Sequence, residues 1–182
     1  MAVTSWNWRK NYRVWEANRK VFAYPENWIE PDVRPSPEPK FELGPIIKAA
    51  KSGRTNVLLR SANPTTALFA ARALATNLGR NVYRVDLSRV VSKYIGETEK
   101  NLELVFASAA SANAVLLFDE ADALFGERTA VKGSDDRFAN QEATYLLQRI
   151  EKFDGVAMLA LNNRTANAAL SKRFAFVLDL PA

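Results

Sequence analysis

Three carboxylates stand together where an apolar run ends, and they are the side chains of this sequence best suited to chemistry. The run from Val115 to Phe118 is followed by Asp119, Glu120 and Asp122. Four consecutive apolar residues indicate a buried strand. A carboxylate at the end of such a strand can hold a hard cation, and a second one can orient a water molecule. An aspartate in this position can equally cap a helix that begins there, so the run alone leaves a catalytic and a structural interpretation open.

The composition excludes several other kinds of chemistry. None of the 182 residues is a cysteine or a histidine, which rules out a disulfide framework, thiolate or imidazole metal sites and a Ser-His-Asp triad. No apolar run approaches the roughly 20 residues that span a bilayer, and the N-terminus lacks the apolar stretch of a secretory signal. We therefore expect a cytoplasmic protein with no membrane partner. The net charge of +5 is the surplus of an ordinary solvated surface.

Apolar strands alternate with helical patterns from about residue 41 onward, and this alternation positions the carboxylates. The pattern predicts strands at Asn56 to Leu59, Asn81 to Asp86, Val115 to Asp119, Val156 to Leu161 and Phe174 to Leu180, and helices at Pro64 to Leu78, Glu97 to Ser111, Asp136 to Phe153 and Ala166 to Lys172. Such a series favours the α/β class, as a three-layer αβα sandwich with a five-stranded parallel sheet. Ligands of such sheets bind at the carboxyl ends of the strands.

The chain divides into two parts, residues 1–40 and residues 41–182. A proline-rich linker at 31–39 separates them, because proline fixes φ and favours an extended chain. Before it, four aromatic residues (Trp8, Tyr12, Trp15 and Phe22) share one face of a predicted helix. Basic residues among these aromatics could indicate a nucleic-acid surface, but glutamates lie among them too. The plainer interpretation is a helix that docks its aromatic face on the neighbouring domain.

Three segments of the second part resemble motifs of AAA+ ATPases, in the order in which that family carries them. The run from Asp119 to Gly126 closely resembles the Walker B segment, and Ser92 to Asn101 resembles the first pore loop and the helix after it. Gly155 to Asn162 resembles the strand that ends in the polar sensor 1 residue. The resemblance covers about residues 41–182 and is greatest to AAA+ ATPases of bacterial contractile injection systems. It implies the AAA+ P-loop NTPase core as the fold.

The resemblance also implies a role for individual residues. ATP and Mg²⁺ would be the cofactors, with Asp119 as the metal partner through a coordinated water, Glu120 polarising the attacking water and Asn162 orienting it. Arg173 would reach the γ-phosphate of a neighbouring subunit, since the family forms rings, here a homo-oligomer. The alternative for Arg173 is an ordinary surface arginine at a helix end.

A second set of implied roles concerns the polypeptide substrate. In remodelling members of the family, an aromatic residue of the first pore loop faces a central pore and grips a polypeptide. The matching residues here are Lys93, Tyr94, Ile95 and Gly96. The alternative is that Tyr94 closes the loop against the core.

The phosphate-binding loop departs from the family pattern GxxxxGK[ST]. Ser61 and Thr66 stand in place of the two glycines, Ala67 in place of the lysine and Leu68 in place of the Mg²⁺-binding hydroxyl. The lysine alone makes a charge-assisted contact of about 1.5–3 kcal/mol, so its loss predicts roughly ten- to hundredfold weaker nucleotide binding. Thr65 and Thr66 remain as hydroxyl donors at the start of the following helix. We expect a residual anion site there, and whether the chain hydrolyses ATP is left open.

Two further observations set the functional hypotheses. The sequence stops at Ala182, where the family continues into a small helical lid, so we expect a core without that lid. Tyr12 to Phe22 and Tyr24 to Pro31 resemble a segment of the A components of bacterial Tc insecticidal toxins. The first hypothesis is an AAA+ ATP-binding protein that remodels or assembles polypeptides in a toxin or injection system. The alternatives are a pseudo-ATPase that binds or assembles without turnover and, less well supported, a nucleic-acid-binding module.

Overall fold

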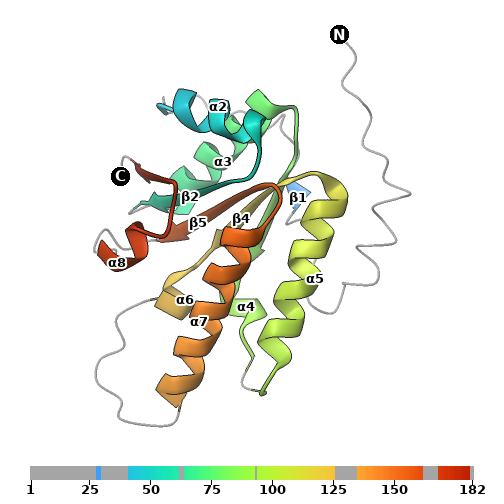
Figure 1. The fold of residues 1–182 in the computed structure, drawn as a ribbon, viewed down its shortest axis with the longest axis vertical. Helices are drawn as coiled ribbons and strands as arrows, with labels where there is room; N and C mark the ends of the chain where they lie inside the picture. The colour runs from blue at the N-terminus through green and yellow to red at the C-terminus, as the bar shows by residue number, and fades with distance from the viewer. Residues whose placement is uncertain are drawn as a thin grey trace.

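A six-stranded sheet with helices on both faces forms the body of the protein in a computed structural model (Figure 1). The structure describes residues 41–61, 64–92, 94–125, 135–161 and 168–180, and the backbone of 28–29; only the backbone is described at 64 and 135–140. The strands, in sheet order, are β1 (Trp28–Ile29), β3 (Val82–Asp86), β4 (Val115–Asp119), β5 (Val156–Leu161), β2 (Thr55–Arg60) and β6 (Phe176–Asp179).

The five strands of the predicted parallel sheet are all present and all parallel, which confirms the fold class. Their carboxyl ends therefore lie along one edge of the sheet. The sixth strand, β1, lies just before the proline-rich linker and pairs antiparallel with β3, with Trp28 opposite Tyr83 and Ile29 opposite Val82. The sheet thus gains one short antiparallel edge strand that the sequence pattern did not predict.

Helices cover both faces of the sheet. The helices within the described residues are α2 (Gly44–Ser52), α3 (Pro64–Leu78), α4 (Leu87–Val90), α5 (Glu97–Ala112), α6 (Asp122–Phe125), α7 (Asp135–Lys152) and α8 (Ala168–Ser171). In Figure 1, α2 and α3 lie on one side of the sheet and α5 and α7 on the other. The three helices that the sequence pattern missed, α2, α4 and α6, are short, and periodicity is a weak signal over so few turns.

Each face of the sheet has its own apolar core, and the strand β4 contributes to both. Leu116 and Phe118 pack with Phe106 of α5 and Leu146 of α7, whereas Leu117 packs with residues of α2 and α3. Side chains alternate between the two faces of a strand. Asp119, two residues after Leu117, therefore belongs to the face that α3 covers.

Candidate functional site

The end of β4 carries the two carboxylates that the sequence singled out. The side chain of Asp119 is completely buried, and its Oδ1 accepts a hydrogen bond of 3.0 Å from the backbone N–H of Glu120. Glu120 is partly exposed and has a φ of +54°, a left-handed conformation that few non-glycine residues adopt. The two acids are neighbours in sequence, and they sit in different environments.

An arginine on the adjacent strand holds the buried acid. Arg84 of β3 donates from Nε at 2.8 Å and from Nη2 at 2.5 Å, both to Oδ2 of Asp119. The strand register brings them together: Arg84 lies opposite Leu117 on the neighbouring parallel strand, so its long side chain reaches the acid two residues further along the same face. The side chain of Arg84 is one-third exposed. The sequence reading missed Arg84, although a basic residue within a predicted central strand was a signal of a buried partner.

A second guanidinium lies near the first. Arg72, on α3, has a lowered pKa because burial disfavours its charged form and because the positive charge of Arg84 repels it. Arg84 contacts the buried carboxylate of Asp119, and Arg72 is near enough to Arg84 for their positive charges to interact.

The residues that replace the phosphate loop are partly buried in the protein core. Residues 62 and 63 lie outside the described ranges, and Ser61 is buried, with its N–H donating to the carbonyl of Leu161 at 3.0 Å. Ala67 is completely buried, and Leu68 packs against the apolar cluster under α3. Of the two threonines predicted to offer hydroxyls, Thr65 is exposed and Thr66 is buried. Of the two predicted hydroxyl donors at the start of α3, Thr65 is therefore the one at the surface.

A Mg²⁺ ion does not fit the residues at this edge as they are arranged. Magnesium is bound through one or two carboxylates and keeps several of its waters, whereas Asp119 has no exposed surface and both of its oxygens already accept hydrogen bonds. Leu68 stands where a hydroxyl is needed. Within the described ranges, no three acidic side chains converge as metal ligands would. The metal role predicted for Asp119 therefore disagrees with the contacts that this side chain makes.

Arg173 lies at the opposite edge of the sheet from Asp119. Its Nε pairs with Glu151 of α7 at 2.7 Å, and its backbone carbonyl accepts a hydrogen bond from Asn56 near the start of β2. Asn56 is level with Leu116 across the sheet, three residues or roughly 10 Å before Asp119 along the strands. Arg173 therefore does not serve the site of its own chain, and its action on a neighbouring subunit stays a prediction. Asn162 lies outside the described residues.

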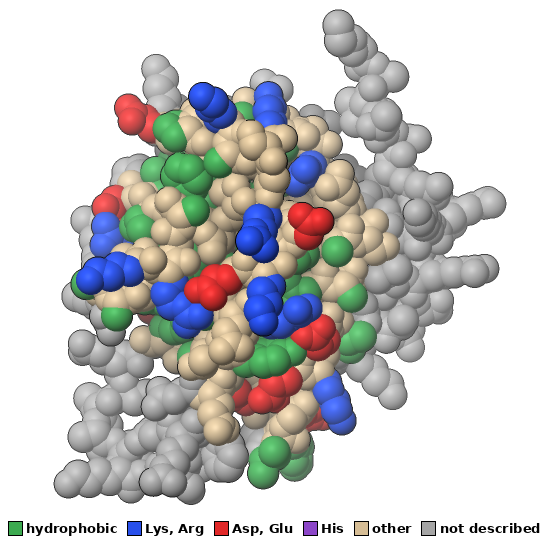
Figure 2. Space-filling model, in the orientation of Figure 1, with side chains coloured by type: hydrophobic (Ala, Val, Ile, Leu, Met, Phe, Trp, Pro, Cys, Tyr) green, Lys and Arg blue, Asp and Glu red, His purple; other side chains and the backbone are tan. Residues whose placement is uncertain are grey.

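The loop before α5 presents its side chains to solvent. Tyr94 is 63% exposed and Ile95 is 85% exposed, so the alternative that Tyr94 packs against the core does not hold. Gly96 caps α5 with a φ of +75°, which glycine adopts without strain. In Figure 2, apolar side chains project at the lower end of the face shown, where Figure 1 places this loop. Lys93 is not among the described residues.

Hydrogen bonds anchor the base of this loop, and the side chains at its tip are exposed to solvent. The backbone N–H of Ser92 donates to Oγ1 of Thr98 at 2.9 Å, and Thr98 is completely buried. The Ser92 hydroxyl donates to the carboxylate of Glu97, and Ser92 Oγ accepts from the N–H of Tyr94 at 3.2 Å. The exposed pair Tyr94–Ile95 is therefore presented on an anchored turn.

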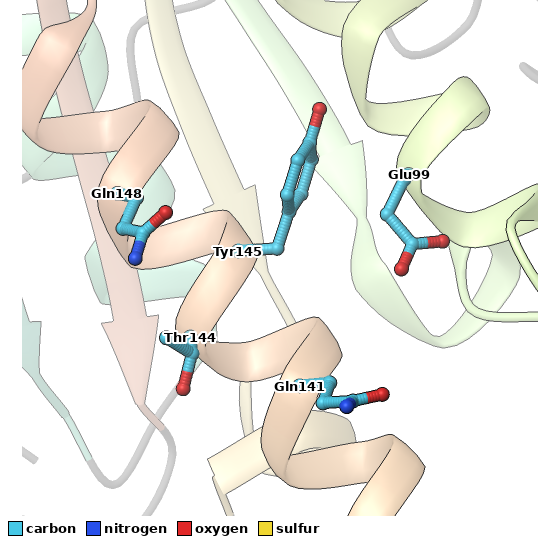
Figure 3. Close-up of a pocket in the computed structure, with 5 residues that line it drawn as sticks. All are labelled: Glu99, Gln141, Thr144, Tyr145 and Gln148. Atoms are coloured by element: carbon cyan, nitrogen blue, oxygen red, sulfur yellow. The ribbon is translucent and has the colours of Figure 1, made fainter.

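A polar groove runs between α5 and α7, close to the same loop. It encloses about 440 Å³ and is lined by Glu99, Gln141, Thr144, Tyr145 and Gln148. Figure 3 shows Glu99 on one side and the other four side chains along α7. Tyr145 donates a hydrogen bond to the carboxylate of Glu103. Burial is the main cause that raises the pKa of Tyr145 to about 12, and the hydrogen bond and negative charge of Glu103 raise it further. No sequence pattern predicted this groove. The polar side chains that line it can form hydrogen bonds with a ligand.

Comparison with known proteins gives two family matches, which do not overlap and leave residues 44–67 between them. The model for the ATPase family associated with various cellular activities (AAA) matches residues 68–182. The model for the ABC toxin N-terminal region matches residues 1–43. The first of these matches begins at Leu68, the last of the residues that depart from the phosphate-loop pattern.

Individual relatives agree with the longer match. The chain is 36% identical over 117 residues to the ATPase family gene 2 protein of Saccharomyces cerevisiae, which covers 62% of this chain and 15% of that protein. It is 34% identical over 116 residues to the 26S proteasome regulatory subunit 10B of Dictyostelium discoideum, covering 63% and 28%. It is 31% identical over 123 residues to the peroxisomal ATPase PEX6 of Saccharomyces cerevisiae, covering 65% and 12%. The chain thus spans well under half of each of these relatives.

Proposed function

Because the chain belongs to the AAA family of ATPases, we propose that it is a polypeptide-binding AAA module of a bacterial toxin or injection system. It engages an extended polypeptide through the anchored loop at Tyr94 and Ile95, and it assembles with copies of itself into a ring. The toxin-like match over residues 1–43 supports the setting. The end of that match, next to the start of α2 at Gly44, supports a domain boundary near residue 40, and we place the protein in the cytoplasm.

The exposure of Tyr94 and Ile95 is the observation that carries this proposal. Among the described residues, the large apolar side chains on the surface are Tyr94, Ile95, Leu104 and Val177, and two of these four are adjacent at one loop tip. Exposed apolar residues that cluster mark interaction sites, whereas scattered ones are ordinary. Extended polypeptides offer apolar side chains for Tyr94 and Ile95 to contact, and the polar groove between α5 and α7 lies beside them.

A nucleic-acid partner is less well supported by the surface. On the face shown in Figure 2, basic and acidic side chains are interspersed over the helices, and no single-sign stripe crosses it. Nucleic-acid sites need clustered lysines and arginines to neutralise phosphates. An oligonucleotide titration at two salt concentrations tests this candidate, and steeply salt-dependent binding would bring it back.

Binding to an unfolded polypeptide tests the main proposal. Fluorescein-labelled reduced and carboxymethylated casein serves as the probe, with anisotropy as the readout. The double variant Tyr94→Ala/Ile95→Ala should weaken binding about tenfold, since two apolar side chains that bury about half of their surface contribute roughly 1–2 kcal/mol. Leu104→Ala is the matched control, because Leu104 is 39% exposed on α5 itself, and it should bind as the wild type does. Equal affinity of all three proteins would contradict the proposal.

Family membership implies ATP and Mg²⁺ as the ligands to test at the carboxyl edge. Here the proposal is that this chain binds and assembles without conventional turnover, as a pseudo-ATPase. The replaced phosphate-loop residues and the engaged carboxylate of Asp119 support it. ATP-driven remodelling is the second candidate, and the partly exposed Glu120 beside Asp119 favours it, since a carboxylate there can polarise water.

A fluorescent ATP analogue separates these two candidates. Titration with Mg²⁺ of the wild type and of Glu120→Gln gives binding, and phosphate release gives turnover. Micromolar binding with turnover that the variant loses would establish the ATPase and refute the pseudo-ATPase. Absence of binding at millimolar nucleotide is the outcome that we expect for a module without turnover.

A further inference from the structure

We propose that Arg84 takes the place of a divalent cation as the permanent partner of Asp119, which makes this edge of the AAA core independent of metal. The inference goes beyond polypeptide binding and does not rest on it. It begins from the burial of Asp119, whose side chain has no exposed surface at the end of a completely buried strand. A carboxylate in such surroundings stays charged only when an opposite charge and hydrogen bonds compensate for lost water.

The compensation comes entirely from the chain itself. Two N–H groups of Arg84 converge on Oδ2 at 2.8 and 2.5 Å, and the N–H of Glu120 supplies Oδ1 at 3.0 Å. A guanidinium presents its donors in a rigid fork and does not lose its proton. The parallel pairing of β3 with β4 sets the separation of the two residues. The pair is therefore part of the sheet and does not depend on a mobile surface contact.

The charges around the pair oppose a second cation. Arg72 lies close enough to Arg84 for the two positive charges to interact, as the lowered pKa of Arg72 shows. A divalent ion next to Asp119 would have to displace Arg84 or share the acid with it, in a region that already holds two guanidinium groups. Both arrangements are repulsive in surroundings shielded from water.

Thermal unfolding of the full chain with and without magnesium tests the inference. The wild type should have the same Tm in EDTA and in millimolar MgCl2. Arg84→Met keeps an unbranched side chain in place of the arginine stem and removes the charged guanidinium, so Asp119 is left buried without a counter-ion, and Tm should fall by about 10 °C. Magnesium should restore several degrees to this variant, because the vacated place then accepts a cation. The double variant Arg84→Met/Asp119→Asn, with no charge in either position, should recover part of the loss and ignore magnesium.

A matched control and an independent measurement complete the test. Arg60→Met removes an arginine that pairs with Asp179 on an adjacent strand, with Nε donating to Oδ1 and Nη2 to Oδ2; this acid is 70% exposed, so the variant should lose little and should not respond to magnesium. Titration of the wild type with Mn²⁺, followed by the EPR signal of the free ion, should show no bound ion at this edge. Uptake of one Mn²⁺ per chain that Asp119→Asn abolishes would overturn the inference, as would an unchanged Tm of Arg84→Met. If Arg84→Met does not fold in either buffer, the Mn²⁺ titration decides. None of these readouts involves Tyr94, so either proposal can fail without the other.

Discussion

Two arginine–carboxylate forks in one sheet show how much the surroundings of an ion pair matter. Arg84 and Asp119 join β3 to β4, and Arg60 and Asp179 join β2 to β6, with closest N–O distances of 2.5 Å in both. The acid is completely buried in the first pair and 70% exposed in the second. Arg60 contacts both carboxylate oxygens of Asp179, whereas both donors of Arg84 converge on one oxygen of Asp119. The larger contrast is burial, so we expect differences in stability to come mainly from exposure to water. The buried pair keeps the carboxylate of Asp119 occupied, whereas the exposed pair of Arg60 and Asp179 should contribute little to stability.

Neutralising the two acids in turn should give the largest contrast. Asp119→Asn should lower the free energy of unfolding by about 3 kcal/mol, because it breaks a buried pair and its hydrogen bonds. Asp179→Asn should lower it by at most about 1 kcal/mol, the usual value of an exposed pair. Urea unfolding followed by circular dichroism measures both. Equal losses would mean that burial does not distinguish the two forks.

Restoring the phosphate loop places a new cation near the buried acid and should have the next largest effect. The variant Ser61→Gly/Thr66→Gly/Ala67→Lys/Leu68→Thr should bind an ATP analogue about ten- to hundredfold more tightly, from the charge-assisted contact that the lysine adds. Fluorescence titration measures the affinity. The same four changes combined with Glu120→Gln should keep the gained affinity. An unchanged affinity would show that the nucleotide does not sit at the start of α3.

Alkaline unfolding examines how dry the other face of β3 is, because Tyr83 packs against the core that α5 and α7 cover, on the opposite side of the strand from Arg84. Burial raises the pKa of Tyr83 to about 12, against the opposing hydrogen bond with Ser108. A raised folded pKa means that the unfolded chain ionises first, near pH 10, so this contribution to stability is complete below pH 10 and is lost as the pH rises toward 12. Tyr83→Phe should lose less stability over that interval. Equal losses of stability in the wild type and in Tyr83→Phe would mean that water reaches the side chain of Tyr83.

Salt should produce the smallest effect and should separate the two forks once more. In 1 M NaCl, with a Debye length of about 3 Å, the stability difference between the wild type and Asp179→Asn should vanish. The difference for Asp119→Asn should remain, since buried pairs are screened far less. Repeating the urea titrations in salt provides the measurement, and a salt-sensitive Asp119→Asn would count against a shielded pair.

The sequence predicted the strands of the sheet better than the contacts between them. The bounds of β4 and β5 were predicted to the residue, because each is a continuous apolar run that ends abruptly. The pairing of Arg84 with Asp119 was not predicted, since it depends on the order and register of strands that lie 35 positions apart in the chain. The short helix α2 was missed because it begins with Gly44 and proline, which do not signal helix in a brief apolar stretch.

The loop residues mark another limit of prediction from sequence. The pattern around Tyr94 was compatible with an aromatic packed on the core and with one held in solvent, since the sequence does not say how a βα loop folds back. In the structure, the N–H of Ser92 donates to the hydroxyl of the buried Thr98, which anchors the base of the loop, and Tyr94 and Ile95 at its tip are exposed. The roles of Lys93 and Asn162 stay predictions, as both lie outside the described residues.

The pairing of Trp28 and Ile29 with β3 joins the toxin-like region to the ATPase-like region through strand hydrogen bonds. Those hydrogen bonds occupy part of the outer rim of β3, whose remaining amides and carbonyls would otherwise be open to another chain. Proteolytic removal of the first 40 residues would therefore do more than discard a targeting or docking element. We expect it to expose an unpaired strand edge on the ATPase-like region and to favour intermolecular strand addition.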